Sequence, residues 1–244
     1  MNQARSIPTT GQIRVLAFDV FGTCVDWHGS IAREVADLHL MGREGPVDGP
    51  AFASALRAGY KPAMARVRSG ELGWTKIDDL HRMILDGVLD DMGVDLPEEA
   101  RVDLNRAWHR LNPWPDTVSG LARLKSRFVI TTLSNGNLGL LTNMAKAAGL
   151  PWDCILSAEV FRHYKPDPET YLGVCEVFDI RPEQMLMVAC HKDDLRAAAS
   201  HGCQTAFVER PLEYGAGVAV DLAVEPDFQF HAVDFNDLAD QLGC

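Results

Sequence analysis

Short apolar runs alternate with longer amphipathic stretches along most of this 244-residue chain, and this alternation constrains its fold more than any other feature. The runs lie at Val15–Phe18, Phe128–Leu133, Cys154–Leu156, Met185–Val188 and Thr205–Val208. Apolar runs separated by helical patterns are typical of βαβ units and predict a mostly parallel sheet. The segment Phe228–Leu242 predicts a final strand and helix that close the sheet. The expected fold class is a doubly wound α/β core.

One interval between these runs is too long for a single crossover connection. Roughly a hundred residues separate the first run from the second, whereas most connections between elements are a few residues long. Most of this interval reads as helix, with apolar and charged residues at helical spacing over Pro50–Arg68 and Thr75–Met92. We therefore expect a helical cap inserted at residues 25–110, and a core domain made of residues 1–24 and 111–244.

The composition is that of a globular protein and argues against several classes of partner. Lys and Arg total 23 against 34 Asp and Glu, which gives a net charge of −11. Nucleic-acid phosphates and anionic membranes repel such a chain, so we expect no nucleic acid and no membrane as partner. The six cysteines include no C-x-x-C pair and read as reduced thiols. Residues 1–14 lack the apolar segment of a signal peptide, so a cytoplasmic protein is expected.

The first apolar run ends in a carboxylate that is followed by a glycine turn, in Phe18-Asp19-Val20-Phe21-Gly22-Thr23. The carboxyl ends of parallel strands face the crevice in which open α/β sheets bind ligands, so Asp19 is expected in the binding site. Many enzymes with this pattern carry a second Asp two residues later, and here that position is Phe21. An apolar residue there removes a proton donor and a neighbour of a metal site.

Polar residues follow three later runs, and one further candidate lies on the expected cap. Ser134 and Asn135 follow the second run, where they suit either a turn that binds an anion or an ordinary helix N-cap. Lys165 precedes a proline after the third run. Asp194 lies in the first turn of a helix after the fourth run, where an acidic residue also favours the helix dipole. Arg57 lies on the first long cap helix, where a surface arginine is the ordinary interpretation.

Together these residues resemble the motifs of the haloacid dehalogenase superfamily, and within it the L-2-haloacid dehalogenase branch. The resemblance covers nearly the whole chain, including the position of the helical cap, and it implies that no cofactor is needed. The residues that match family motifs are Asp19, Thr23, Arg57, Ser134, Asn135, Lys165, Tyr171 and Asp194.

The resemblance assigns roles to the residues around the substrate. Asp19 matches the nucleophile of the D-x-[FY]-G-T motif, and Thr23 matches its supporting hydroxyl. Ser134 and Asn135 match the S-N-G motif, in which the serine holds the substrate carboxylate and the asparagine helps to bind the halide. Arg57 resembles the cap arginine that meets the leaving halide.

The resemblance also implies a mechanism with a covalent intermediate. The carboxylate of Asp19 attacks the halogen-bearing carbon and forms an aspartyl ester. Water then attacks the ester, oriented by Asp194 and by Lys165 of the K-P-D-x-x-x-Y segment that also contains Tyr171. The product is a 2-hydroxy acid. The groups available to offset the two negative charges are Lys165, Arg57 and the backbone N–H groups of Val20, Phe21 and Asn135.

Two other functions stay open on the sequence. Phosphatases of the superfamily resemble D-x-D at the first motif and G-D-x-x-x-D at the last, and the extra carboxylates protonate the leaving group and complete a magnesium site. This chain has Phe21 and Cys190 there, and a thiol does not replace a carboxylate on Mg²⁺, so we expect no metal. The other alternative is a binding protein that does not turn over a substrate. The intact set of site residues disfavours this hypothesis.

The segment after the fourth run departs from the dehalogenase branch. The common pattern resembles S-S-N-x-x-D, whereas this chain has Ala189-Cys190-His191 before Asp194. This segment and the Val25-Asp26-Trp27 start of the cap are similar to a subgroup that includes fluoroacetate-dehalogenating members. His191 therefore either joins Arg57 and Asn135 in the halide pocket, or it caps its helix or bonds Asp194. The expected partner is a small halogenated carboxylic acid, and the resemblance implies a homodimer.

Overall fold

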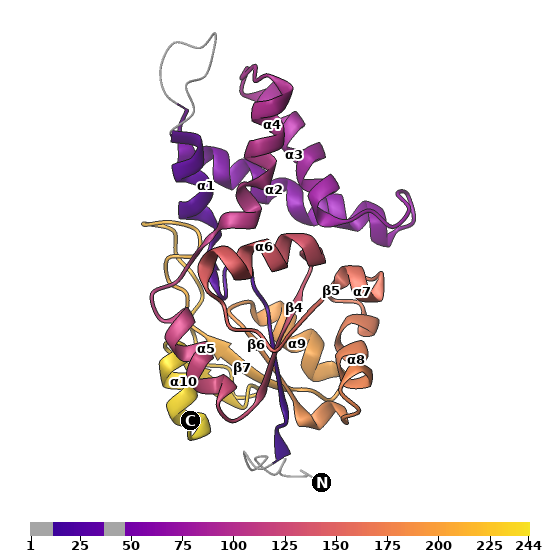
Figure 1. Ribbon diagram of the computed structural model, residues 1–244, viewed down its shortest axis with the longest axis vertical. Coiled ribbons are helices and arrows are strands. Elements are labelled where there is room, and N and C mark those ends of the chain that lie inside the picture. The colour runs from indigo at the N-terminus through magenta and orange to yellow at the C-terminus, as the bar shows by residue number, and fades with distance from the viewer. Residues whose placement is uncertain (1–11, 37–46) are drawn as a thin grey trace.

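The computed structural model describes residues 12–36 and 47–244 and contains the expected parallel sheet (Figure 1). Its six strands lie in the order β5-β4-β1-β6-β7-β8, and all neighbouring pairs are parallel. The strands are β1 Val15–Phe18, β4 Val129–Ser134, β5 Cys154–Ser157, β6 Met185–Ala189, β7 Gln204–Val208 and β8 Phe230–Ala232. The first five were predicted to within one residue at either end, and β8 lies in the predicted closing segment.

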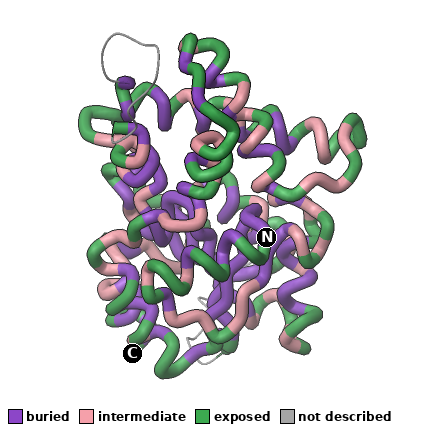
Figure 2. The backbone as a smooth tube through the Cα atoms, turned by 45° about the horizontal axis from the view of Figure 1, so that its top comes forward, coloured by how far each residue is buried: buried purple, intermediate pink, exposed green. Residues whose placement is uncertain are grey.

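Helices cover both faces of the sheet, as the fold class predicts. Successive side chains of a strand point to opposite faces, so Leu16 and Phe18 of β1 join one core, and Val15 and Ala17 join another. The helices on the first face are α5 Thr117–Lys125, α6 Leu138–Ala148 and α10 Phe235–Leu242, and those on the second are α8 Pro168–Val177 and α9 Lys192–Ser200. Figure 2 shows buried residues along the middle of the molecule and exposed residues on the outer helices.

Most of the interval between β1 and β4, up to residue 110, forms helices that lie beyond the carboxyl ends of the strands (Figure 1). They are α1 Trp27–Ala36, α2 Gly49–Arg68, α3 Ile77–Asp91, α4 Glu98–Asn105 and the 3-10 helix η2 Arg106–Arg110, here called the cap helices. The chain enters and leaves this segment through two antiparallel strands, β2 Val25–Asp26 and β3 Asn112–Pro113.

The predicted helices at residues 50–68 and 75–92 are α2 and α3. Residues 37–46 of the expected cap and residues 1–11 of the expected core lie outside the described residues. The division of the chain at residues 25 and 110 remains a prediction. Of the helices that the structure describes, none combines the length and the apolar character needed to cross a membrane.

The turn after β1 is fixed by donors from distant parts of the chain. The backbone carbonyl of Gly22 accepts from Trp114 Nε1, that of Cys24 from Thr117 Oγ1, and that of Thr23 from Arg210 Nε, each at 2.8 Å. Buried carbonyl groups are costly to leave without a partner, so these bonds restrict the turn to one conformation. The segment that carries Asp19 is thereby held rigid at the end of the central strand.

Packing between α5 and α10 depends on a residue without a side chain. A Cβ atom built on Gly120 would lie 2.4 Å from Cβ of Phe235, whereas one built on the exposed Gly87 of α3 meets no atom within 4 Å. We predict that Gly120→Ala lowers the free energy of unfolding by about 1–3 kcal/mol through overpacking. Gly87→Ala, the matched control, should raise it by up to about 1 kcal/mol because alanine favours the helix. Urea unfolding measures both, and equal effects would contradict the proposed contact.

Candidate active site

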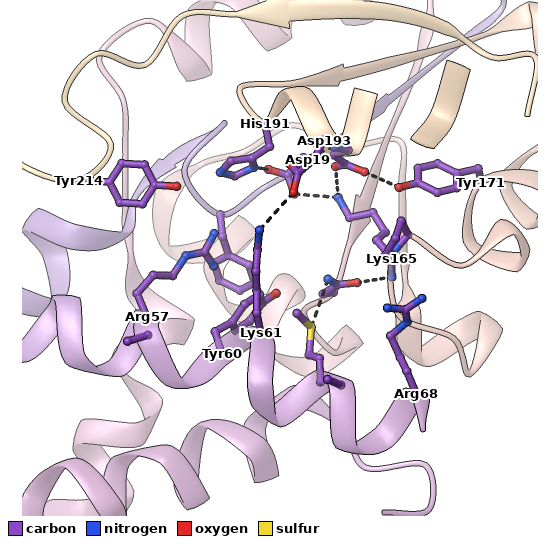
Figure 3. A pocket seen from close by; sticks show the side chains of 17 residues that line it. Asp19, Arg57, Tyr60, Lys61, Arg68, Lys165, Tyr171, His191, Asp193 and Tyr214 are labelled. Carbon is purple, nitrogen blue, oxygen red and sulfur yellow. Dashed lines mark hydrogen bonds and ion pairs between the residues drawn. The ribbon is translucent and has the colours of Figure 1, made fainter. Parts of the chain in front are cut away.

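A cavity of about 640 Å³ lies between α2 and the carboxyl ends of the central strands (Figure 3). The predicted residues that line it are Asp19, Phe21, Arg57, Asn135, Lys165, Tyr171, His191 and Asp194. Val20, Thr23 and Ser134 are buried and do not line it. The fold thus brings together residues from four strand ends and one cap helix, as expected for a crevice at the carboxyl edge of a parallel sheet.

Asp19 receives hydrogen bonds on both carboxylate oxygens. Lys165 Nζ lies 2.9 Å from Oδ1, and the hydroxyl of Thr23 donates to Oδ2 at 2.7 Å. His191 Nδ1 lies 3.1 Å from Oδ2. Burial alone would raise the pKa of Asp19, but the charge of Lys165 and the contact with His191 outweigh it and hold that pKa well below its usual range. Asp19 is therefore an anion at neutral pH, as a carboxylate nucleophile must be.

Lys165 joins Asp19 to a second carboxylate. Its Nζ lies 2.5 Å from Oδ2 of Asp194, and the Tyr171 hydroxyl donates to the other oxygen of Asp194 at 2.6 Å. Burial opposes the ammonium charge, yet Asp19 and Asp194 raise the pKa of Lys165 above its ordinary value. Burial also raises the pKa of Asp194 despite the attraction of Lys165. Two carboxylates whose pKa values move apart suit different tasks, so Asp19 fits attack and Asp194 fits proton transfer.

Arg57 reaches the cavity from the cap side. Its guanidinium carbon lies 4.6 Å from the ring centroid of Tyr60 and 5.4 Å from that of Trp27. Within residues 12–36 and 47–244, Arg57 has neither a salt bridge nor a side-chain hydrogen bond, unlike Lys165. A half-buried guanidinium that keeps its N–H groups free beside a cavity suits an anionic ligand.

The turn after β4 was expected to be either an anion-binding turn or a helix N-cap, and it differs in part from both. The side-chain oxygen of Asn135 accepts from the backbone N–H of Lys165 at 2.8 Å, which fixes the amide beside the cavity. The Ser134 hydroxyl accepts from the N–H of Gly136 inside the protein, so it does not reach the cavity wall. The N-cap of α6 is Asn137, whose side chain bonds Asp78 of α3 instead of capping the helix.

His191 makes neither of the contacts that its ordinary interpretation offered. It is the N-cap of α9 but has no side-chain capping bond, and its ring contacts Asp19 instead of Asp194. Its second nitrogen, Nε2, lies 2.7 Å from Oε1 of Glu213. His191 does line the same cavity as Arg57 and Asn135.

Glu213 is the main site residue that the sequence analysis missed. It is buried in the loop after β7, where it also accepts from Trp27 Nε1 at 3.3 Å. A signal was available, because the loop after the fifth apolar run also begins at the carboxyl edge of the sheet. Glu213 lies behind His191 and does not itself line the cavity. The residues that line the cavity and were not predicted are Ala58, Tyr60, Lys61, Met64, Ala65, Arg68, Pro166, Asp193 and Tyr214.

The residues present do not fit the magnesium site of the phosphatases. Phe21 is buried with its ring edge-on to Trp108 of the cap helix η2, at 5.7 Å between centroids, and it offers no oxygen. Cys190, His191 and Glu213 lie close enough together to suggest a metal site. However, His191 Nε2 and Glu213 Oε1 are 2.7 Å apart, which is a hydrogen-bond distance and shorter than two ligands on one tetrahedral zinc ion, about 3.3 Å.

Comparisons with known proteins agree with this site. A family model described as haloacid dehalogenase-like hydrolase matches residues 13–202. The crystal structure of the L-2-haloacid dehalogenase PA0810 has a TM-score of 0.90 and 43% identity, covering 95% of this chain and 99% of that one. The defluorinating L-2-haloacid dehalogenase Rha0230 has the same TM-score and identity, covering 95% and 96%.

More distant relatives include both chemistries that the sequence left open. An L-2-haloacid dehalogenase from Xanthobacter autotrophicus, solved with chloropropionic acid covalently bound, has a TM-score of 0.76 and 25% identity over 95% of this chain and 98% of that one. The phosphoglycolate phosphatase of Salmonella typhimurium is 28% identical over 95% of this chain and 93% of its own length.

Identity at this lower level does not separate the two activities, whereas the two relatives at 43% identity are both L-2-haloacid dehalogenases. The chain belongs to the haloacid dehalogenase-like hydrolases, in their L-2-haloacid dehalogenase branch.

Proposed function

We propose that this protein hydrolyses the carbon–halogen bond of short (S)-2-haloacids and haloacetates, without a metal, and releases 2-hydroxy acids. The observation that carries the proposal is the buried Asp19 anion, which faces a cavity with Lys165 on one oxygen while the position two residues on is the apolar Phe21. A halide leaves as a stable anion and needs no proton, so the acid that a phosphatase has at that position is not required.

In the first step, one oxygen of Asp19 attacks the halogen-bearing carbon from the side opposite the halide and inverts it. Nucleophile and substrate are both carboxylates, so their repulsion in a buried site requires nearby positive charge. Lys165 supplies it at Asp19, 2.9 Å away. The guanidinium of Arg57 and the side-chain amide of Asn135 line the cavity, where they can hold the substrate carboxylate and the departing halide. Asn135 Nδ2 also donates to Met64 Sδ at 3.3 Å, which directs the amide from the side of α2.

In the second step, water hydrolyses the aspartyl ester. Asp194 is placed to take a proton from the water, because it shares the ammonium group of Lys165 with Asp19. Tyr171 donates to Oδ1 of Asp194, whereas Oδ2 of Asp194 faces Lys165. The positive charge of Lys165 thus serves both steps. That the protein acts as a homodimer in the cytoplasm remains a prediction.

Halide release from chloroacetate and (S)-2-chloropropionate, measured beside phosphate release from p-nitrophenyl phosphate, tests the function directly. We expect halide release that survives dialysis against a strong chelator, since no magnesium ligand set is present at Phe21 and Cys190. Phosphate release that requires Mg²⁺ would instead support the phosphatase alternative. A folded protein that releases neither product would support the binding-protein reading.

The role of Asp19 is tested by a single turnover in water enriched in ¹⁸O. We expect the label first in Asp19 and only later in the product, because the product takes its hydroxyl oxygen from the carboxylate. Asp19→Asn should lower the rate by on the order of 10⁴-fold, as the loss of an attacking group does. Label that enters the hydroxy acid during the first turnover would show direct attack of water on carbon.

Fluoroacetate is a further substrate that we propose, on the strength of the defluorinating relative at 43% identity. Fluoride is strongly hydrated and leaves only with short hydrogen-bond donors in place of water. Both ring nitrogens of His191 already face carboxylates, so we assign the halide to Arg57 and Asn135. Arg57→Lys should therefore slow fluoride release more than chloride release, because lysine lacks the planar fork. Rapid chloride release with no fluoride release from the wild type would exclude this substrate.

A further inference from the structure

Glu213 and His191 form a second charged layer behind the nucleophile. The Glu213 side chain is 2% exposed, and its Oε1 contacts His191 Nε2 at 2.7 Å. On the other side of the ring, His191 Nδ1 lies 3.1 Å from Oδ2 of Asp19, as Figure 3 shows. The imidazole therefore lies between two buried carboxylates.

The two carboxylates determine the charge of the ring. A neutral imidazole carries one N–H and would turn a lone pair toward either Asp19 or Glu213, whereas an imidazolium donates to both. We infer that Glu213 is a positioning residue that holds His191 as an imidazolium against Oδ2 of Asp19, so that this oxygen becomes the carbonyl of the aspartyl ester and is stabilised when water attacks. This inference rests on the proposed function and extends it to the second half of the reaction.

The groups around His191 favour the charged ring. Asp19, Cys190 and Glu213 contact it, Asp193 and Tyr214 line the same cavity, and Lys165 lies beyond Asp19. Burial lowers the pKa of His191, but the contacts with Cys190, Glu213 and Asp19 outweigh it and raise that pKa well above its ordinary value. Burial also raises the pKa of Cys190, so the thiol stays protonated and the negative charges beside the ring are those of the two carboxylates. The contact with His191 lowers the pKa of Glu213 against its burial. Both partners therefore stay ionised through the neutral range.

The turn after β1 leaves room for the side chain of Glu213 at Gly22. Gly22 has a φ of +86°, and a Cβ atom built on it would lie 2.4 Å from Oε1 of Glu213. Glycine is needed there for the backbone conformation and also for the close approach of this carboxylate. The contact thus depends on two features, the Glu213 side chain in the loop after β7 and the missing side chain of Gly22 in the turn after β1.

The hydrogen bonds distinguish the two oxygens of Asp19. Oδ2 accepts from Thr23 and His191, whereas among the described residues Oδ1 accepts from Lys165 alone. Since a carboxylate oxygen has two lone pairs, Oδ1 retains one for attack. Oδ1 then becomes the ester oxygen beside Lys165, and Oδ2 becomes the carbonyl oxygen between Thr23 and the imidazolium.

The hydrolysis step then follows from the same contacts. Water adds to Cγ of Asp19 and gives one proton to Asp194, while negative charge develops on Oδ2. The Cγ–Oδ1 bond breaks, and Oδ1 leaves as the product hydroxyl with a proton from Lys165, which Asp194 then replaces. The second proton of the water is lost to solvent when the new carboxyl of Asp19 ionises. No oxidant or metal is required.

The test is Glu213→Gln, which keeps the shape of residue 213 and removes its charge. NMR of ¹⁵N-labelled histidine should show His191 as an imidazolium through the neutral range in the wild type and titrating at lower pH in the variant. In rapid-quench single turnovers with (S)-2-chloropropionate, halide release should change by less than about threefold. Hydroxy-acid release should fall by about tenfold or more at alkaline pH, so that the ester accumulates, and the defect should shrink at lower pH where the ring is charged again. That is less than the loss on the order of 10²–10³ for removing an oxyanion donor outright, because neutral His191 still donates once.

Two further variants isolate the effect. Glu209→Gln removes a similar pair, since Glu209 follows the same strand and contacts His231 at 2.7 Å. Unlike His191, His231 does not line the cavity, so this variant should leave both steps unchanged. His191→Gln should accumulate the ester at all pH values and so tests the inference even if Glu213→Gln does not fold.

A neutral His191 in the wild type would overturn the inference, as would equal losses of halide and hydroxy-acid release in both site variants. A wild-type protein that releases no halide would overturn the proposed function together with the kinetic part of the inference. The histidine titration would then still decide whether Glu213 sets the charge of His191.

Discussion

The site depends on the placement of one ammonium group, Lys165 Nζ, between two buried carboxylates. Ionised groups lose several kcal/mol of hydration on burial, and only close opposite charges with further hydrogen bonds offset that loss. Lys165 gives this compensation to Asp19 and Asp194 together. His191 continues the alternation of sign from Asp19 to Glu213. The result is a chain of five charges in which each anion has a cation beside it, without a metal ion in the scheme.

This arrangement requires three separate strand ends and the β7 loop to meet within a few ångströms. The sheet achieves this because parallel strands end at one edge, and the turn after β1 is fixed there by Trp114, Thr117 and Arg210. The cap helix α2 closes the opposite wall with Arg57 and adds two exposed ion pairs to the core, Lys61–Asp193 and Arg68–Asp167. Exposed pairs of this kind contribute little stability, so the contact between cap and core rests mainly on apolar packing.

The sequence predicted the strands and the polar residues at their carboxyl ends because those features depend on local patterns. An apolar run predicts a buried strand. Asp19, Lys165 and Asp194 could be identified as site residues because they follow such runs. Glu213 was missed because its role depends on a contact with His191 from another strand end and on the missing side chain of Gly22. Ser134 shows the opposite problem. It lies next to Asn135 in the sequence, but the turn directs its hydroxyl to Gly136 and away from the cavity. Neither outcome can be read from spacing alone.

The packing of Phe21 against Trp108 has a consequence for how the two chemistries of this family can interconvert. Residue 21 belongs to the turn after β1, whereas Trp108 belongs to the inserted segment, far away in the sequence. An aspartate at position 21 would place a carboxylate against an indole ring without gaining the second carboxylate that Cys190 replaces. A path from dehalogenase to phosphatase therefore crosses intermediates with a buried, unpaired charge. A smaller residue in place of Trp108 would open this position to water and lower the cost of a carboxylate there, so a change in the insertion would ease a change in the catalytic turn.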